Sequence, residues 1–222
     1  MAKASVVVFG TGEQADVAHF YLRHDSPYEV AAFTVDAKYL QASSFNRLPV
    51  VPFEEIAQQF PPAANAMFVA IGYKGVNALR TEKYLAAKAM AYKLISYVSS
   101  KATVWPGFYV GENCFILEDN TIQPFVTIGN NVTLWSGNHI GHHSTIGDHC
   151  FVTSHVVISG GVNIGEACFI GVNATIRDHV KLGKACVIGA GSLILQDVAD
   201  FSVYSQAGAQ LSRVPSFRLK KL

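Results

Sequence analysis

Histidine is concentrated in one short stretch of this sequence. Five of the eight histidines lie between residues 139 and 155: His139, His142, His143, His149 and His155. Imidazole titrates near neutral pH, so a histidine can take a proton from an amine or hydroxyl as that group attacks an acyl carbon. The cluster as a whole favours such chemistry, although any one of these side chains taken singly is more simply a surface residue.

A phosphate-binding pattern stands near the start of the chain. Residues 10–15 read Gly-x-Gly-x-x-Ala, between an apolar run at 5–9 and a predicted helix. In this pattern Gly10 makes the turn, Gly12 lets the backbone approach a diphosphate, and the helix N-terminus favours the anion. Asp36 ends the next predicted strand, where it can accept hydrogen bonds from a ribose or a base. We expect a nucleotide-containing ligand; the alternative is an α/β domain that only packs against the rest of the chain.

Strands and helices alternate through residues 1–97. The sequence predicts strands at 5–9, 29–35, 66–71 and 93–95, and helices at 13–23, 53–60 and 76–90. This alternation is typical of a parallel α/β sheet. Its length, about 95 residues, is half of a dinucleotide-binding fold, with room for one mononucleotide but not for NAD.

Residues 98–199 follow a period of six. Every sixth residue from Val98 to Ile194 is Val, Ile or Leu, and Gly often comes next, at 111, 129, 141, 147, 165, 171, 183 and 189. This pattern predicts a parallel β-helix with three short strands in each coil of 18 residues. We expect the aliphatic side chains to point inward, and the following Gly to form the corner by adopting positive φ.

The fold class that we predict is therefore a half-Rossmann α/β domain (1–97) followed by a left-handed parallel β-helix (98–199), with a C-terminal tail (200–222). The coil length places Gly160 one coil after His142. We expect this glycine to leave room for a substrate beside the imidazole. The N–H groups of Gly160 and Gly161 could then polarise a carbonyl.

The four cysteines obey the same coil length. Cys150, Cys168 and Cys186 are 18 residues apart, and Cys114 precedes Cys150 by two coils. We expect them to form a column of small buried side chains; a redox or metal role is the alternative.

Composition excludes several classes of protein. The 222 residues are 50% hydrophobic and 15% charged, with a formal net charge of +1. The hydrophobic content argues against a disordered polyelectrolyte, and the charge balance argues against a general nucleic-acid or membrane-surface protein. Neither a membrane span nor a signal peptide is recognisable, and no CxxC pair is present, so we expect a cytoplasmic protein with reduced cysteines.

A zinc site is the competing interpretation of the histidines, because imidazole is a common zinc ligand. The similar γ-class carbonic anhydrases hold zinc with three histidines on such a β-helix, two of them five residues apart. No two histidines of this cluster have that spacing. We therefore expect a site without metal.

The whole layout resembles the bacterial NeuD/PglD family of sialic-acid O-acetyltransferases and nucleotide-amino-sugar N-acetyltransferases. The matching segments are Gly10–Ala15, Ala70–Gly72, Asn77–Arg80, Ile140–Gly147, Gly160–Gly165, Phe169–Asn173 and Ile188–Gly191. The resemblance implies a homotrimer with active sites between adjacent β-helices. It also implies acetyl-CoA as co-substrate, lying along the groove between them.

The resemblance assigns roles residue by residue. His142 matches the general base and Gly160 matches a glycine whose N–H contacts the thioester carbonyl. Val172 and Ala190 match positions along the CoA arm. The nucleotide-sugar side comprises Gly10, Gly12, Asp36, Gly72, Asn77 and Arg80.

Three positions depart from the family pattern. The residue after the base is usually Asp or Glu, and here it is His143, which we include in the catalytic site. A second family histidine is replaced by Phe151, and His155 can substitute for it in contacting acetyl-CoA. An Asn that often precedes the base by seven residues is replaced by Trp135.

The sequence thus predicts an acetyl-CoA-dependent N-acetyltransferase of a nucleotide-linked 4-amino-6-deoxy sugar in surface glycan synthesis. His142 would act as general base in a direct transfer. O-acetylation of a sialic-acid-type sugar is the first alternative. A structural β-helix whose histidines pack between subunits is the second.

Overall fold

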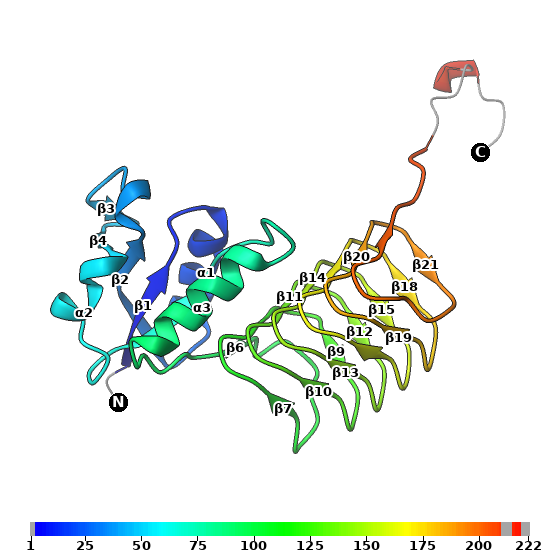
Figure 1. Ribbon diagram of the computed structural model, residues 1–222, viewed down its shortest axis with the longest axis horizontal. Coiled ribbons are helices and arrows are strands. Elements are labelled where there is room, and N and C mark those ends of the chain that lie inside the picture. Colours follow the sequence, from blue (N-terminus) through cyan, green and yellow to red (C-terminus); the bar gives the residue numbers. More distant parts are fainter. Residues whose placement is uncertain (1–2, 210–214, 219–222) are drawn as a thin grey trace.

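The computed structural model describes residues 3–209 and 215–218, and it has two parts (Figure 1). An α/β domain at the N-terminal end is joined to a long prism of stacked coils. The predicted fold class, an α/β domain followed by a left-handed parallel β-helix, is confirmed. Residues 210–214 and 219–222 of the predicted tail lie outside the described part.

The N-terminal sheet has the strand order β3-β4-β2-β1-β5. Its strands are β1 (Ala4–Phe9), β2 (Tyr28–Val35), β3 (Ser44–Phe45), β4 (Leu48–Pro52) and β5 (Ala66–Val69). All pairs are parallel except β3 with β4. The chain runs from β1 outward to β4 and then returns to the other side of β1 at β5, which creates a topological switch point between β1 and β5.

The β3–β4 hairpin was not expected from the sequence. Conversely, the strand predicted at 93–95 is reduced to a single bridge between Leu94 and Met67. Pro49 and Pro52 interrupt the apolar run of β4 and so weaken the strand signal in the sequence. β4 joins the parallel part of the sheet through β2 alone.

Two long helices cover opposite faces of this sheet. They are α1 (Glu13–His24) and α3 (Ala78–Ala89); the short α2 (Ile56–Gln59) and the 3-10 turns Ala37–Tyr39, Phe53–Glu55 and Ser216–Arg218 complete the helical elements. Val6 and Val8 pack with α1, and Val7 and Phe9 pack with α3, as alternate residues of a strand must. None of the helices in the described ranges is long and apolar enough to cross a membrane.

Three parallel sheets form the walls of the β-helix. Sheet I contains β6 (Tyr97–Val98), β8 (Phe115–Ile116), β11 (Thr133–Leu134), β14 (Phe151–Val152), β17 (Phe169–Ile170), β20 (Val187–Ile188) and β22 (Val203–Tyr204). Sheet II contains β9 (Thr121–Ile122), β12 (His139–Ile140), β15 (Val157–Ile158), β18 (Thr175–Ile176) and β21 (Leu193–Ile194). Sheet III contains β7 (Tyr109–Val110), β10 (Thr127–Ile128), β13 (Thr145–Ile146), β16 (Asn163–Ile164) and β19 (Lys181–Leu182). The chain visits them in the order I, II, III, so each coil has three corners.

The predicted coil length is confirmed through most of the stack. Thr127 pairs with Thr145, Thr133 with Phe151, and so on at intervals of 18 residues. The final turn is shorter, because Val187 pairs with Val203, an interval of 16. The six-residue count therefore fails after Ile194, and sheet I continues past residue 199 to Tyr204.

The glycines that follow the aliphatic residues do not have positive φ, contrary to the sequence-based expectation. Positive φ occurs two residues later, at corner positions such as Asn131 and His149. A Cβ added at Gly147 would lie 2.8 Å from the backbone nitrogen of Glu166 in the next coil. These glycines are required because the coils stack backbone against backbone, and a side chain would separate them.

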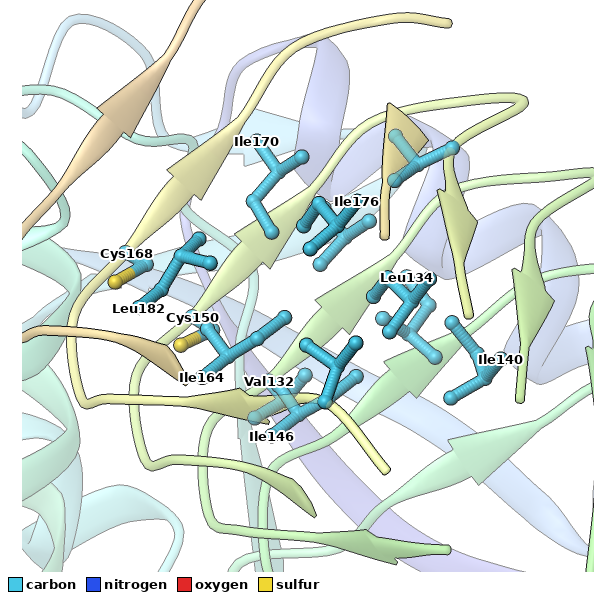
Figure 2. Close-up of a cluster of buried hydrophobic side chains, with 14 of the residues drawn as sticks. Val132, Leu134, Ile140, Ile146, Cys150, Ile164, Cys168, Ile170, Ile176 and Leu182 are labelled. Atoms are coloured by element: carbon cyan, nitrogen blue, oxygen red, sulfur yellow. The ribbon is translucent and has the colours of Figure 1, made fainter. Parts of the chain in front are cut away.

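The interior of the β-helix is a single column of aliphatic side chains (Figure 2). All four cysteines belong to it, fully buried and free of disulfides. The Cys150 thiol, for example, donates to the Gly165 carbonyl at 3.1 Å. Burial raises the pKa of the Cys114 thiol to about 12, which keeps it protonated. The predicted column of small buried side chains is confirmed.

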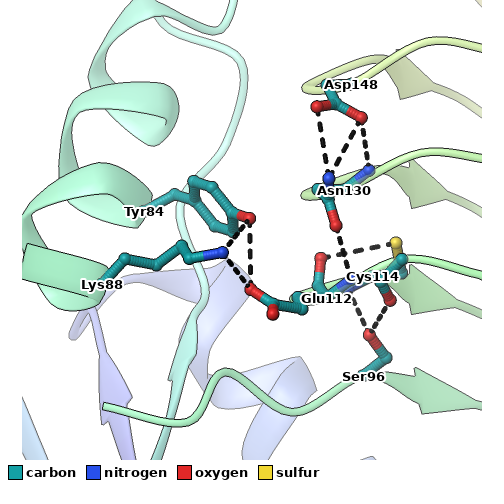
Figure 3. A network of polar contacts seen from close by, with 8 residues as sticks. Tyr84, Lys88, Ser96, Glu112, Cys114, Asn130 and Asp148 are labelled. Atoms are coloured by element: carbon teal, nitrogen blue, oxygen red, sulfur yellow. Dashed lines mark hydrogen bonds and ion pairs between the residues drawn. The ribbon is translucent and has the colours of Figure 1, made fainter. Parts of the chain in front are cut away.

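Polar contacts join α3 to the corner between sheets III and I (Figure 3). The ammonium of Lys88 lies 2.7 Å from Glu112, and the Tyr84 hydroxyl also donates to that carboxylate at 3.3 Å. On the β-helix itself Asp148 accepts from the backbone and side chain of Asn130, one coil below it. This corner, the III–I corner, is where the α/β domain is anchored.

Candidate active site

The glycine-rich loop and the ends of three strands surround a cavity of about 370 Å³ at the switch point. Gly10 has φ of +126°, and a Cβ there would meet the Ala70 carbonyl at 2.7 Å. Gly12, at the N-terminus of α1, faces open space, since a Cβ would meet nothing within 4 Å. The cavity therefore offers a bare backbone and a helix N-terminus, which together suit a diphosphate. Gly72 lies on the opposite rim.

Asp36 lines the same cavity, paired with a residue that the sequence reasoning missed. The ammonium of Lys83 in α3 lies 2.7 Å from an Asp36 carboxylate oxygen, and both side chains are about nine-tenths buried. Burial alone would lower the pKa of Lys83, but its bonds to Asp36 and Glu82 raise it above the ordinary value. Lys83 thus stays charged and holds Asp36 at the cavity wall. A signal existed: Arg80, Lys83 and Tyr84 occupy the buried stripe of α3, where cations are uncommon.

Asn77 and Arg80, predicted to bind substrate, are instead buried in the domain junction. The Asn77 amide donates to the carbonyls of Ala167 and Cys168, each at 3.1 Å. The Arg80 guanidinium donates to the carbonyls of Asn131, His149 and Cys150. The prediction is corrected for these two residues: their side chains are buried and engaged with the β-helix backbone, and Arg80 Nε, which has no partner, is itself buried at the junction.

His142 and His143 lie side by side at a different corner, between sheets II and III. Their Nδ1 atoms are 3.1 Å apart, so one ring donates a hydrogen bond to the other, and both side chains are exposed. The His142 backbone N–H donates to the Gln123 side chain at 2.9 Å, which fixes the backbone from which the imidazole projects. The His143 ring also packs against Phe125, with centroids 4.7 Å apart. Gln123 was not identified from the sequence, because it belongs to the preceding coil.

The space above His142 is not vacant, contrary to our expectation. A Cβ at Gly160 would lie 2.7 Å from the Cε1 atom of His142, so the imidazole itself fills the place of the missing side chain. The Gly161 N–H donates to the His142 carbonyl at 2.8 Å and is not free. Within residues 3–209 and 215–218, the Gly160 N–H has no such partner. One of the two predicted N–H donors is therefore available beside the imidazole.

The residues expected along the CoA arm lie at the third corner, between sheets I and II. Val172 and Ala190 occupy equivalent exposed positions one coil apart there. His155 belongs to the same corner, with φ of +57° and its ring over Gly137. This corner, the I–II corner, lies across sheet II from His142. A single chain therefore does not bring the predicted base and the predicted CoA contacts together.

A second cleft, of about 500 Å³, opens between the α/β domain and this I–II corner. It shares Glu13, Gln14 and Gly72 with the nucleotide cavity. Across it stand Trp135 and Val172 of the β-helix. The two spaces therefore adjoin at Glu13, Gln14 and Gly72, and the cleft extends from them to the I–II corner.

Backbone geometry at the corners accounts for the occurrence of several histidines, and His143 is one of them. His143, His149, His155 and His179 all have positive φ, a conformation in which His is enriched among residues that carry a Cβ. Among the residues that the structure describes, no group of three His, Cys, Asp or Glu is placed to hold a metal ion.

Comparison with known proteins relates both parts of the chain to acyltransferases. Residues 125–160 and 161–196 match the family described as bacterial transferase hexapeptide (six repeats). The perosamine N-acetyltransferase from Caulobacter crescentus, solved with CoA and GDP-perosamine, is 26% identical and superposes with a TM-score of 0.81 over 91% of this chain and 94% of that chain. The search of curated proteins finds no match.

Two more distant structures share the fold. The acetyltransferase domain of PglB from Neisseria gonorrhoeae FA1090 gives a TM-score of 0.82 at 22% identity, over 92% of this chain and 97% of that chain. WeeI from Acinetobacter baumannii AYE gives 0.68 at 17% identity, over 90% of this chain and 96% of that chain. The two-part architecture is therefore common to all of these proteins.

Proposed function

We propose that this chain, whose residues 125–196 are hexapeptide repeats of the bacterial transferase type, is an acetyl-CoA-dependent N-acetyltransferase of a nucleotide-linked 4-amino-6-deoxy sugar. The observation that carries the proposal is the exposed His142–His143 pair beside the N–H of Gly160, which has no backbone partner in the described part of the chain. Support also comes from the Caulobacter enzyme, which is solved with CoA and GDP-perosamine bound on the same architecture.

The chemistry follows from these groups. Nε2 of His142 takes a proton from the sugar amine as the nitrogen lone pair attacks the thioester carbonyl carbon. The Gly160 N–H stabilises the oxyanion that develops on the carbonyl oxygen. The C–S bond then breaks, and the CoA thiolate takes the proton from the imidazolium. For Nε2 to act as base, Nδ1 of His142 carries hydrogen and donates to Nδ1 of His143.

His143 thus stands at the position where the resembling family usually has a carboxylate. A neutral imidazole can orient its neighbour, but it does not stabilise the imidazolium by charge. His143 is therefore a positioning residue in this proposal. Its positive φ, +59°, suits His, Asn or Asp at this corner.

The complete site requires a second copy of the chain, and we propose a homotrimer assembled through sheet II. The outward positions of sheet III are Tyr, Thr, Asn and Lys, while sheet I is partly covered by the α/β domain. The outward positions of sheet II are Thr121, His139, Val157, Thr175 and Leu193, of which Val157 is 38% and Leu193 59% exposed. Packing around sheet II would place the II–III corner of one copy, with His142, against the I–II corner of its neighbour. We place the trimer in the cytoplasm, where acetyl-CoA is supplied.

The first experiment measures thiol release from acetyl-CoA with GDP-, UDP- and dTDP-linked 4-amino-4,6-dideoxy sugars. We expect turnover with at least one of them. His142→Ala should lower kcat by about 10²–10⁴-fold with KM little changed. His24→Ala, an exposed histidine of α1 outside the site, is the control. A His142→Ala enzyme within threefold of wild type, or no turnover with any acceptor, would contradict the assignment.

The shared site is tested by mixing two inactive chains. Gly12→Asp should block the diphosphate by charge without a clash, since nothing lies within 4 Å of the new Cβ. Co-expressed with His142→Ala, it should form mixed trimers in which an intact nucleotide cavity faces an intact base. Partial recovery of activity is expected. No recovery, or a monomeric mass in light scattering, would contradict the intersubunit site.

A further inference from the structure

The cleft beside Trp135 continues directly from the nucleotide cavity. Glu13, Gln14 and Gly72 line both, so the two spaces meet at the N-terminus of α1. The cleft measures about 500 Å³, which is enough for one hexose ring and part of an acyl arm. A sugar attached to a diphosphate at Gly12 would enter it.

We propose that this cleft holds the acceptor sugar and that Trp135 determines its selectivity for sugars that lack the hydroxyl at C6. The proposal rests on the proposed function, which it extends from a reaction class to a particular wall of the site.

The lining is divided by polarity. Val17, Trp135 and Val172 present apolar surface, while Glu13 and Ser154 present hydrogen-bonding groups. A pyranose ring has the same division, with C–H bonds on its faces and hydroxyls at its rim. A C6 methyl adds apolar surface on one side, and an aromatic ring is a large flat partner for it. A C6 hydroxyl against the same wall would lose its hydrogen bonds to water.

Trp135 is held firmly enough to discriminate. Its ring packs against the apolar cluster that joins α1 to sheet I. Its backbone carbonyl accepts from the side chains of Asn120 and Asn138, and its N–H donates to the Val152 carbonyl at 2.9 Å. The backbone of Trp135 is thus fixed by hydrogen bonds and its ring is held by packing, and a wall must be rigid to reject an added hydroxyl.

The pantetheine arm of acetyl-CoA is the rival occupant, because Val172 also lies on the expected CoA path. The sugar is the favoured occupant, because the cleft shares Glu13, Gln14 and Gly72 of the α/β domain with the nucleotide cavity. The two occupants predict different kinetic changes, and the experiment below separates them.

Binding is read first, by fluorescence, and needs no turnover by a variant of Trp135. The chain has two tryptophans, so Trp105→Phe leaves Trp135 as the sole indole. Trp105 is 57% exposed and does not line the cleft. The nucleotide sugar that the wild-type enzyme acetylates should change the indole emission, and its nucleoside diphosphate alone should not. Equal responses to both, or no response to the sugar at saturation, would overturn the proposal.

Kinetics then test selectivity. Trp135→Ala should raise KM for the acceptor roughly tenfold, with KM for acetyl-CoA within twofold; Trp135→Phe should lie between. Wild type should prefer the 6-deoxy acceptor over its 6-hydroxy counterpart by at least about fourfold in kcat/KM, and Trp135→Ala should lose most of that preference. An increase in KM confined to acetyl-CoA would assign the cleft to pantetheine. Failure of the wild-type enzyme with every acceptor would instead overturn the proposed function.

Discussion

Replacing Arg80 should destabilise the junction between the two parts of the chain by several kcal/mol. The corner at residues 131, 149 and 167 turns its carbonyl groups toward α3. Within the described residues, Asn131 and His149 have no hydrogen-bond donor for their carbonyls other than the Arg80 guanidinium. The side chain is 1% exposed, so water does not replace it. Arg80 therefore completes the hydrogen bonding of the β-helix backbone from outside the β-helix.

The magnitude follows from two opposing effects. Burial lowers the pKa of Arg80 to about 10, so the guanidinium is charged at neutral pH and its desolvation is a cost that Arg80→Ala would remove. Against this, each hydrogen bond from a charged donor is worth about 1.5–3 kcal/mol, and two carbonyls would lose their only partner. That loss, about 3–6 kcal/mol, outweighs the desolvation cost that the substitution removes, because the carbonyls stay buried when the guanidinium is gone. We expect a net loss of about 3 kcal/mol, a large part of the usual 5–15 kcal/mol.

The assay is urea unfolding at a fixed protein concentration, with hydrogen exchange to locate the change. Arg80→Ala and Arg80→Met should both lose stability, with faster exchange in residues 73–81 and around His149. Arg80→Lys should lose less, since one ammonium can still reach a carbonyl. Arg177→Ala, an exposed β-helix arginine, should change stability by less than about 0.5 kcal/mol. An Arg80→Met protein as stable as wild type would refute the reasoning, because it would show that the carbonyls do not need the donor.

Three further outcomes are expected. Gly147→Ala should lower the free energy of urea unfolding by about 1–3 kcal/mol, because its Cβ would lie 2.8 Å from the backbone of the next coil. The control Gly208→Ala, whose Cβ would meet nothing within 4 Å, should leave stability unchanged. Equal stabilities of the two variants would refute the stacking argument. Burial lowers the pKa of His149, so the unfolded chain binds the proton more readily and stability should fall as pH drops below 6.5; His149→Asn should flatten that slope in unfolding measured from pH 7 to 5. Lys83→Met should raise KM for the nucleotide sugar roughly tenfold, because it releases the Asp36 carboxylate that Lys83 holds, and KM for acetyl-CoA should be unchanged. A change in stability alone would assign Lys83 a packing role.

The repeating part of this protein was the more predictable from sequence. A six-residue period repeated over a hundred positions determines which side chain faces inward, and each coil hydrogen-bonds only to its neighbours, so a local pattern is also the global structure. The reason for the glycines was wrong, because a single sequence does not distinguish a residue needed for positive φ from one needed for close approach. Positive φ at Asn131 and His149 was visible only in the structure.

The site was less predictable because it depends on contacts between distant segments. Asn77 and Arg80 belong to a motif near the nucleotide cavity, yet their side chains point away from it into the III–I corner. The buried stripe of α3 indicates that Arg80 and Lys83 are both buried, but it does not indicate which of them faces the cavity and which faces the β-helix. Lys83, three residues after Arg80, faces the cavity instead. The packing of α3 against both the N-terminal sheet and the β-helix determines which side chain faces which surface.

The proposed role of His142 would explain why a repeat fold suits acyl transfer. Each corner repeats every coil, so a groove along a corner presents the same backbone at regular intervals to a long, extended acyl carrier. In the proposed mechanism the reactive point on this groove is His142, whose imidazole leans over Gly160, and the Gly160 N–H has no backbone partner within the described residues. The cavity that we propose for the nucleotide is on a separate domain and adjoins the I–II corner of its own chain, and in the proposed trimer the His142 that faces this corner belongs to a neighbouring copy. Under this proposal, changes at Trp135 or Asp36 would alter selectivity for the acceptor while the coil that carries His142 stays constant.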